Sequence, residues 1–191
     1  MTHDLRPAPS PVGAQLPRPS TWFTWHDHLL GPGVRVLDLA CGDGRHAVAA
    51  ALLGATVVAV DKDSGALERG REAAMARGLE IEWREADLTD VLPSLGTWDV
   101  VLVFNYLDRA RMDAVRSLVA PGGALLMETF LAAQRHLGWG PTSDDHLLTA
   151  GELNRLVAPL AVAHGREVVE PVEGDRWRAV ASAFAQRIVT A

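Results

Sequence analysis

Two acidic side chains beside a glycine-rich turn indicate what kind of ligand this chain could bind. Asp38 lies near the end of the alternating, mainly apolar run at 34–39, and Asp43 lies inside the turn, between Gly42 and Gly44. Glycine adopts backbone angles that other residues resist, so such a turn can approach a ligand closely. The two carboxylates would repel a pyrophosphate and attract an ammonium or sulfonium group. The turn is therefore predicted to bind a ligand that carries positive charge.

The elements around this turn are those of a nucleotide-binding βαβ unit. A helix-forming run at 47–53 follows the turn and ends at Gly54. A second apolar strand is predicted at 56–60 and leads directly into Asp61. An acid at the tip of the second strand is placed to accept hydrogen bonds from both hydroxyls of a ribose. The acids of both strands thus belong to one ligand-binding edge.

The run Val36-Leu-Asp-Leu-Ala-Cys-Gly-Asp-Gly44 resembles the first motif of the class I methyltransferases that depend on S-adenosylmethionine (SAM). SAM carries an ammonium and a sulfonium, in agreement with the acidic turn. The resemblance covers about residues 20–190. It implies SAM as the cofactor, S-adenosylhomocysteine (SAH) as its product, and in-line methyl transfer to an acceptor. The segments 44–46 and 146–153 look like those of the bacterial tellurite-resistance group of small-molecule methyltransferases.

The order of the predicted elements indicates an α/β fold. We expect a Rossmann-like three-layer α/β/α sandwich around a seven-stranded, mostly parallel sheet with a C-terminal antiparallel hairpin. The other strands are expected at 79–84, 98–104, 124–130, 160–170 and 176–189. The other helices are expected at 20–30, 65–77, 108–120 and 150–158, with Ser20, Ser64 and Thr149 as caps. One domain at 20–191 would follow a flexible proline-rich leader at 1–19.

The expected cofactor site combines the glycine turn with the ends of the second, third and fourth strands. In the family an acid after the third strand contacts the adenine amino group, and Asp87 with Leu88 matches that position. Asn105 and Tyr106 follow the strand at 98–104, at the edge where open α/β sheets hold ligands. The expected cofactor-binding residues are Asp38, Ala40, Gly42, Asp43, Gly44, Asp61, Lys62, Asp87, Leu88, Asn105 and Tyr106.

No residue stands out as a catalytic group, which suits methyl transfer. A sulfonium is already a good leaving group, so alignment and exclusion of water can suffice. If the acceptor must lose a proton, His136 or His146 could act as general base, with Tyr106 a further candidate, although isolated histidines are more often ordinary loop residues. The irregular segment 131–149 is expected to form the acceptor wall. The helix at 20–30 would lie opposite, its aromatic face either covering the cofactor or packing on the sheet.

Composition narrows the choice of partners. The net charge of -6 disfavours a nucleic acid, and the Asp/Asn-Pro-Pro-aromatic motif of base and amide methyltransferases is absent after the fourth strand. A small-molecule acceptor is therefore expected. No apolar stretch is long enough for a bilayer, no secretory signal is present, and Cys41 is the single cysteine, so a cytoplasmic location is expected. The seven histidines form no cluster with zinc spacing, so no metal is expected.

Two other protein classes fit part of the pattern. Gly42-x-Gly44-x-x-Ala47 also satisfies the dinucleotide fingerprint, so a dinucleotide-dependent oxidoreductase stays open, although Asp38 and the terminal hairpin disfavour it. A non-catalytic, regulatory SAM-binding protein would keep the same acids and stays open too. The sequence defines neither the acceptor nor the oligomeric state.

Overall fold

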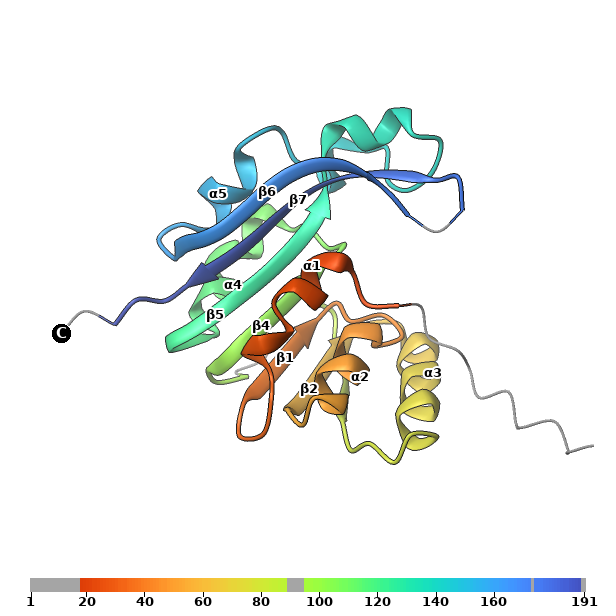
Figure 1. Cartoon of the computed structure of the whole chain (residues 1–191), viewed down its shortest axis with the longest axis vertical. Helices are drawn as coiled ribbons and strands as arrows, with labels where there is room; N and C mark the ends of the chain where they lie inside the picture. The colour runs from red at the N-terminus through yellow and green to blue at the C-terminus, as the bar shows by residue number, and fades with distance from the viewer. Residues whose placement is uncertain (1–17, 89–94, 173, 190–191) are drawn as a thin grey trace, which may run out of the picture.

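A seven-stranded sheet forms the centre of the protein (Figure 1). The computed structural model describes residues 18–88, 95–172 and 174–189. The strands lie in the order β3-β2-β1-β4-β5-β7-β6, and β7 runs antiparallel to the other six described strands. The strands are β1 (Arg35–Leu39), β2 (Thr56–Asp61), β3 (Glu82–Glu85), β4 (Trp98–Phe104), β5 (Val119–Phe130), β6 (Ala161–Pro171) and β7 (Trp177–Gln186). The expected mostly parallel sheet with a C-terminal hairpin is confirmed.

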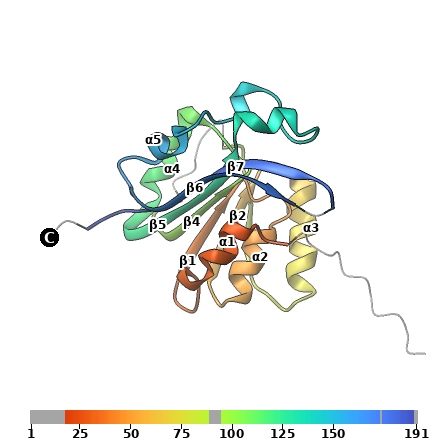
Figure 2. The same cartoon turned by 45° about the horizontal axis from the view of Figure 1, so that its top comes forward.

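Helices cover both faces of this sheet, which makes the fold three-layered (Figures 1 and 2). The α-helices are α1 (Thr21–Trp25), α2 (Arg45–Leu52), α3 (Ser64–Met75), α4 (Met112–Ser117) and α5 (Glu152–Val157). Side chains alternate along β4 because successive residues of a strand point to opposite faces. Val100 and Leu102 belong to the core under α1, α2 and α3, whereas Val101 and Val103 belong to the core under α4 and α5.

The region predicted as one helix at 20–30 is divided into two short helices. Ser20 caps α1 as expected, because its side-chain oxygen accepts a hydrogen bond from the backbone N–H of Phe23. The α-helix stops at His26, whose ring Nδ1 lies 2.9 Å from the carbonyl oxygen of Trp22. Because a side chain engages that carbonyl, the α-helical hydrogen-bond pattern ends and the chain continues as the 3-10 helix η1 (Asp27–Leu29).

Two helix caps differ from the sequence prediction. Asp63, not Ser64, caps α3, since its extended backbone lets the carboxylate accept a backbone N–H from the first turn. At α5 the cap is Gly151 in the left-handed region, while Thr149 bonds through its hydroxyl to the Glu152 carboxylate. At α3 a carboxylate, which is the stronger acceptor, thus takes the hydrogen bond that the prediction gave to a hydroxyl, whereas at α5 no side chain caps the helix.

Several other helix and strand boundaries differ from the predicted ones. Strand β5 begins at Val119, because Trp98 pairs with that residue before the register shifts along β4. The expected helix at 108–120 is accordingly shorter, with the 3-10 helix η2 (Arg109–Arg111) before α4. The irregular segment contains the 3-10 helices η3 (Ala132–His136) and η4 (Asp144–His146). The predicted leader lies outside the described residues apart from its last two. No described helix has the length and apolar character needed to cross a membrane.

Candidate cofactor site

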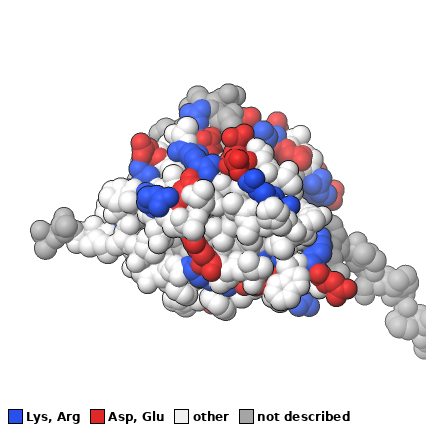
Figure 3. All heavy atoms as spheres, turned by 90° about the horizontal axis from the view of Figure 1, so that it is seen from above, with Lys and Arg blue, Asp and Glu red and all other residues white. Residues whose placement is uncertain are grey.

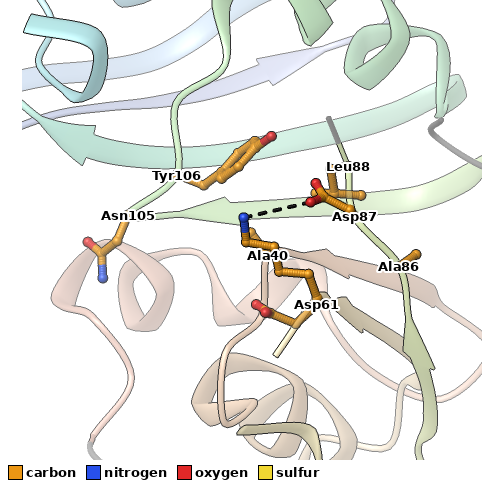
Figure 4. Close-up of a pocket in the computed structure, with 8 residues that line it drawn as sticks. Ala40, Asp61, Ala86, Asp87, Leu88, Asn105 and Tyr106 are labelled. Atoms are coloured by element: carbon orange, nitrogen blue, oxygen red, sulfur yellow. Dashed lines mark ion pairs between the residues drawn. The ribbon is translucent and has the colours of Figure 1, made fainter. Parts of the chain in front are cut away.

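Two adjoining cavities open at the carboxyl ends of β1, β2 and β4. The first encloses about 260 Å³, and its lining consists of Ala40, Asp61, Lys62, Ala86, Asp87, Leu88, Asn105 and Tyr106 (Figure 4). The second encloses about 240 Å³, and its lining consists of Asp38, Ala40, Cys41, Gly42, Asp43, Arg45, His46, Phe104 and Asn105. The structure thus brings together every residue expected in the cofactor site except Gly44. Ala40 and Asn105 line both cavities, so the two form one continuous site.

Gly44 has a packing role instead. A Cβ atom at this position would lie 2.3 Å from the ring of Trp83, and the φ angle of Gly44 is +73°. The same ring would be 2.5 Å from a Cβ at Gly70 of α3. Trp83 of β3 is therefore wedged against two glycines, and this contact holds α2 and α3 close to the edge of the sheet beside the turn.

The backbone of the site is held in an unusual conformation. Ala40 and Asn105 have φ angles of +52° and +57°, and among the described residues they are the only ones other than glycine with positive φ. Left-handed backbone costs a non-glycine residue roughly 1 kcal/mol and persists where the surrounding structure fixes it. Both residues line both cavities, so the two strained residues of the described chain coincide with the site.

Asp61 is held rigidly at the tip of β2. Its Oδ2 accepts the backbone N–H of Gly42 at 2.7 Å, and its Oδ1 accepts the N–H of Asp63 at 2.9 Å. Each carboxylate oxygen has a second lone pair. The side chain lines the first cavity, so these remaining lone pairs can accept hydrogen bonds from a ligand diol.

Asp38 is the most unusual charged group of the site. It is 1% exposed, and its Oδ2 has no hydrogen-bond partner among the described residues. Burial raises the pKa of this carboxyl to about 7, although the backbone N–H of Ala47 and the Arg45 guanidinium counteract part of the effect. A buried acceptor without a partner, in the wall of a cavity, fits the cationic group of a ligand.

Asp87 and Tyr106 form one side of the first cavity, and Asp61 lies across from them (Figure 4). Asp87 forms an ion pair with Lys62 at 3.7 Å. Burial, helped by the charges of Asp108 and Asp87, raises the pKa of the Tyr106 phenol to about 12. The phenol thus stays protonated near neutral pH, and its buried oxygen has no hydrogen-bond partner in the described part of the chain. It can donate a hydrogen bond to a ligand.

Some lining residues were not predicted. Arg45, His46 and Phe104 line the second cavity, and they directly follow the glycine turn or end β4. The His46 ring stacks on Phe104 and accepts the backbone N–H of Ser20 through Nε2 at 3.2 Å. Burial lowers the pKa of His46 well below its usual value, so the ring is neutral and anchors the start of α1. Burial also raises the pKa of the Cys41 thiol, which makes that residue a poor nucleophile.

The histidines expected as possible bases lie elsewhere. His136 and His146 are exposed, in η3 and η4, and neither is among the residues that line the two cavities. The η4 segment is held by Arg109, which donates to the carbonyl of Leu147 at 2.8 Å. The aromatic face of α1 packs on the sheet, since both Trp22 and Phe23 are buried in the core. The structure therefore supports the packing alternative for that helix.

A third cavity adjoins the second one and is called here the arginine cavity. It encloses about 440 Å³, and its lining consists of Arg18, Pro19, Ser20, Thr21, Arg45, Asn105, Phe130, Trp139, Pro171, Val172, Arg176 and Arg178. Arg45 and Asn105 line both the second cavity and this one. Residues at the start of α1 and Trp139 thus line a cavity that adjoins the cofactor site, whereas His146 does not.

Comparison with known proteins agrees with this geometry. A family model described as a methyltransferase domain matches residues 36–123, which include the glycine turn and strands β1 to β4. The ribosomal protein L11 methyltransferase of Symbiobacterium thermophilum is 38% identical over 144 residues, which cover 72% of this chain and 46% of that protein. The matched part of the chain is therefore a methyltransferase domain, similar to those of the class I SAM-dependent enzymes.

Other methyltransferases are similar to this one. A ubiquinone biosynthesis O-methyltransferase of Dinoroseobacter shibae is 31% identical, with 65% of this chain and 58% of that protein covered. TehB from Haemophilus influenzae superposes with a TM-score of 0.72 at 18% identity, covering 86% of this chain and 61% of that one. A methyltransferase from Methanosarcina mazei gives 0.70 at 17% identity, covering 87% and 98%. These two structures show the fold. The chain spans 46% to 65% of the first three curated relatives.

Proposed function

We propose that this methyltransferase transfers the methyl group of SAM to a small-molecule acceptor. The observation that carries the proposal is the buried carboxylate oxygen of Asp38, which lines the second cavity without a partner among the described residues. SAM brings a cationic ammonium and sulfonium to such a carboxylate, whereas a dinucleotide would bring a pyrophosphate. The charge of the site therefore favours SAM over the dinucleotide alternative.

Different residues of the two cavities would hold different parts of SAM. Asp61 would hold the ribose hydroxyls through its free lone pairs, and Asp87 with Leu88 would hold the adenine. Asp38, Asp43 and the turn would hold the amino-acid part in the second cavity. When bound, the sulfonium supplies an activated methyl group, whose bond to sulfur breaks as the acceptor's lone pair forms the new bond, leaving SAH.

The residues of the site align the reactants and exclude water, and they contribute little acid–base chemistry. The pKa of the Tyr106 phenol is about 12, so this group stays protonated near neutral pH and cannot accept a proton from the acceptor. His46 uses its Nε2 on Ser20, and Cys41 is buried. A rigid backbone around Ala40 and Asn105 fixes the geometry instead. We therefore propose that the acceptor reaches the site already nucleophilic or releases its proton to water.

The shape of the site supports a small acceptor. The arginine cavity joins the cofactor site at Asn105 and encloses about 440 Å³, a volume suited to a small organic molecule. On the face shown in Figure 3, Lys and Arg side chains are interspersed with Asp and Glu, and no continuous basic surface for a nucleic acid is visible there. We also propose a cytoplasmic location, which the free thiol of Cys41 supports.

Ligand titration of the purified protein tests the proposal in two steps. SAH should raise the melting temperature by several degrees, whereas millimolar NAD should not. SAH release from SAM is then measured with a panel of small phenols, thiols, amines and chalcogen oxyanions. A response to NAD without a response to SAH would overturn the cofactor assignment. SAH binding without turnover of any acceptor would favour the regulatory, non-catalytic alternative.

A further inference from the structure

The arginine cavity differs in charge from the rest of the protein. Four arginines line it, Arg18, Arg45, Arg176 and Arg178, and its lining contains no Asp or Glu. The chain as a whole carries a net charge of -6. A concentration of positive charge in one cavity of an acidic protein indicates the charge of the ligand that this cavity accepts.

The four arginines are not equally available. Arg178 is already paired, because it donates to the carboxylates of Glu128 and Glu170. Arg18, Arg45 and Arg176 form no ion pair with any residue that the structure describes. Among the described residues, the side chain of Arg45 donates only to the carbonyl of Arg18, at 3.3 Å. Three of the arginines that line the cavity therefore have hydrogen-bonding capacity left over.

Arg45 shows that this positive charge is not fully compensated. Burial lowers its pKa, and the neighbouring charge of Arg178 lowers it further, although Glu128, Asp38 and Asp43 counteract this. A ligand anion beside Arg45 would relieve both effects, because it would replace lost water and neutralise the repulsion between the two guanidiniums. The arginine lies where the arginine cavity meets the second cavity.

Two aromatic side chains, Phe130 and Trp139, form part of the remaining wall of the cavity. The Trp139 and Phe130 rings meet edge to face with centroids 6.0 Å apart, and the Trp139 indole N–H donates to the carbonyl of Trp177 at 2.7 Å. The guanidinium of Arg176 lies over the Trp139 ring, 5.2 Å from its centroid. A fixed ring beside guanidinium groups can hold a molecule that has an apolar body and an anionic end.

We propose that the methyl acceptor is an organic anion, an apolar body that carries a carboxylate or a phosphate group. Arg18, Arg45 and Arg176 bind its anionic group, and Trp139 contacts its apolar body. Its nucleophilic atom then lies toward Asn105, where the arginine cavity opens into the cofactor site. This inference rests on the proposed methyltransferase function, since it assigns the acceptor of that same site.

Calorimetric titration of the SAH-saturated protein with matched probes tests this inference. Benzoate and phenyl phosphate are the two anionic probes, and benzamide is the neutral isostere. We expect at least one anion to bind about tenfold more tightly than benzamide, the size of one charge-assisted contact. The double variant R18Q/R176Q should lose that preference while SAH affinity is unchanged, because neither residue lines the first two cavities. R69Q removes an exposed arginine from α3 and should bind as the wild type does.

The outcomes separate the two proposals. If SAH itself fails to bind, the proposed function is wrong. If SAH binds but benzamide binds as well as both anions, or neither anion binds at millimolar concentration, the acceptor is not an organic anion and the inference is overturned. The inference is also overturned if both R18Q/R176Q and R45Q still bind the anionic probes more tightly than benzamide, as the wild type does.

Discussion

The cofactor site and the arginine cavity share a border but have opposite charge. Asp38, Asp43, Asp61 and Asp87 line the first two cavities, whereas the third has four arginines and no acid in its lining. The contrast suits a reaction in which a cationic methyl donor meets an anionic acceptor. Each partner would be attracted to its own cavity and repelled by the other. Charge can therefore set which molecule enters each side.

The two regions are also stabilised differently. In the cofactor site, short acidic side chains are fixed by backbone N–H groups, as Asp61 is by Gly42 and Asp63. The arginine cavity depends on long side chains, and its Arg178 is held by the carboxylate of Glu128, which is fully buried on β5. The first arrangement joins the tip of β2 to the turn that follows the neighbouring strand β1. The second depends on an ion-pair network that joins β5 to the terminal hairpin.

Replacing Glu128 with alanine should give the largest effect. The carboxylate accepts hydrogen bonds from Arg166, Arg178 and Ser182, and its loss leaves buried donors unpaired. We expect the free energy of unfolding to fall by about 3–5 kcal/mol in urea titrations. SAH should still stabilise the folded variant, because Glu128 lines neither cofactor cavity. Loss of SAH binding by a folded E128A protein would show that the two regions are not separable.

Replacing Asp38 with asparagine should change the pH dependence of stability. The folded pKa of about 7 is above the ordinary aspartate value of 3.8, so the folded protein holds a proton that the unfolded chain releases, and stability falls as pH rises through this window. Between pH 5 and pH 8 the wild type should lose about 2.5 kcal/mol more than D38N. Comparing the two pH values cancels the pH-independent cost of burying the amide.

The same variant tests the role of this carboxyl in binding. A ligand ammonium near Asp38 would lower its pKa, so SAH binding near pH 6.5 should release protons from the wild type and fewer from D38N. Calorimetry in buffers of different ionisation enthalpy measures this number. If the two proteins release equally many protons, Asp38 does not contact the charged part of the ligand.

Replacing Asp61 with asparagine should weaken SAH binding by about 1.5–3 kcal/mol, the usual loss for a charge-assisted hydrogen bond. Calorimetric titration measures this difference. Some stability should be lost as well, since an amide cannot accept through both of its ends from Gly42 and Asp63. D63N is the matched control, because asparagine caps a helix as well as aspartate does. Equal SAH affinity of folded D61N and wild type would remove Asp61 from the site.

Replacing Trp139 with alanine should have the smallest effect, and only on the acceptor side. We expect the anionic probes of the arginine cavity to bind more weakly by about 1 kcal/mol, as for loss of one aromatic contact. SAH affinity should stay within about 0.5 kcal/mol of the wild type. H146A should change neither quantity, because His146 is exposed and lines none of the three cavities. A larger effect of H146A than of W139A would reverse this assignment.

The cofactor side was predictable because its residues are contiguous with strand ends. Asp38, Asp61 and Asp87 each lie at or just beyond the end of a predicted strand, and parallel strands bring their carboxyl ends to one edge of the sheet. The sheet itself could be predicted for the same reason. Helix boundaries were less accurate, since the end of α1 is decided by the His26 ring reaching the Trp22 carbonyl. No local pattern encodes that contact.

The arginine cavity could not be predicted, because its residues are scattered in sequence. Arg18 precedes α1, Arg45 begins α2, and Arg176 precedes β7. Only tertiary packing makes them neighbours. The segment 131–149 was expected to face the acceptor, and Trp139 does line this cavity, but the two histidines of that segment gave no indication of the arginines.

The order of strands in the sheet has a consequence for synthesis. Strand β7 is made after β6, yet it lies between β5 and β6. While the ribosome is still adding residues 177–186, β5 has an open edge and Glu128 lacks Arg178, one of its two cationic partners. We expect the nascent chain to close its sheet only after β7 has left the ribosome. Until then its exposed apolar edge is the part most dependent on chaperones.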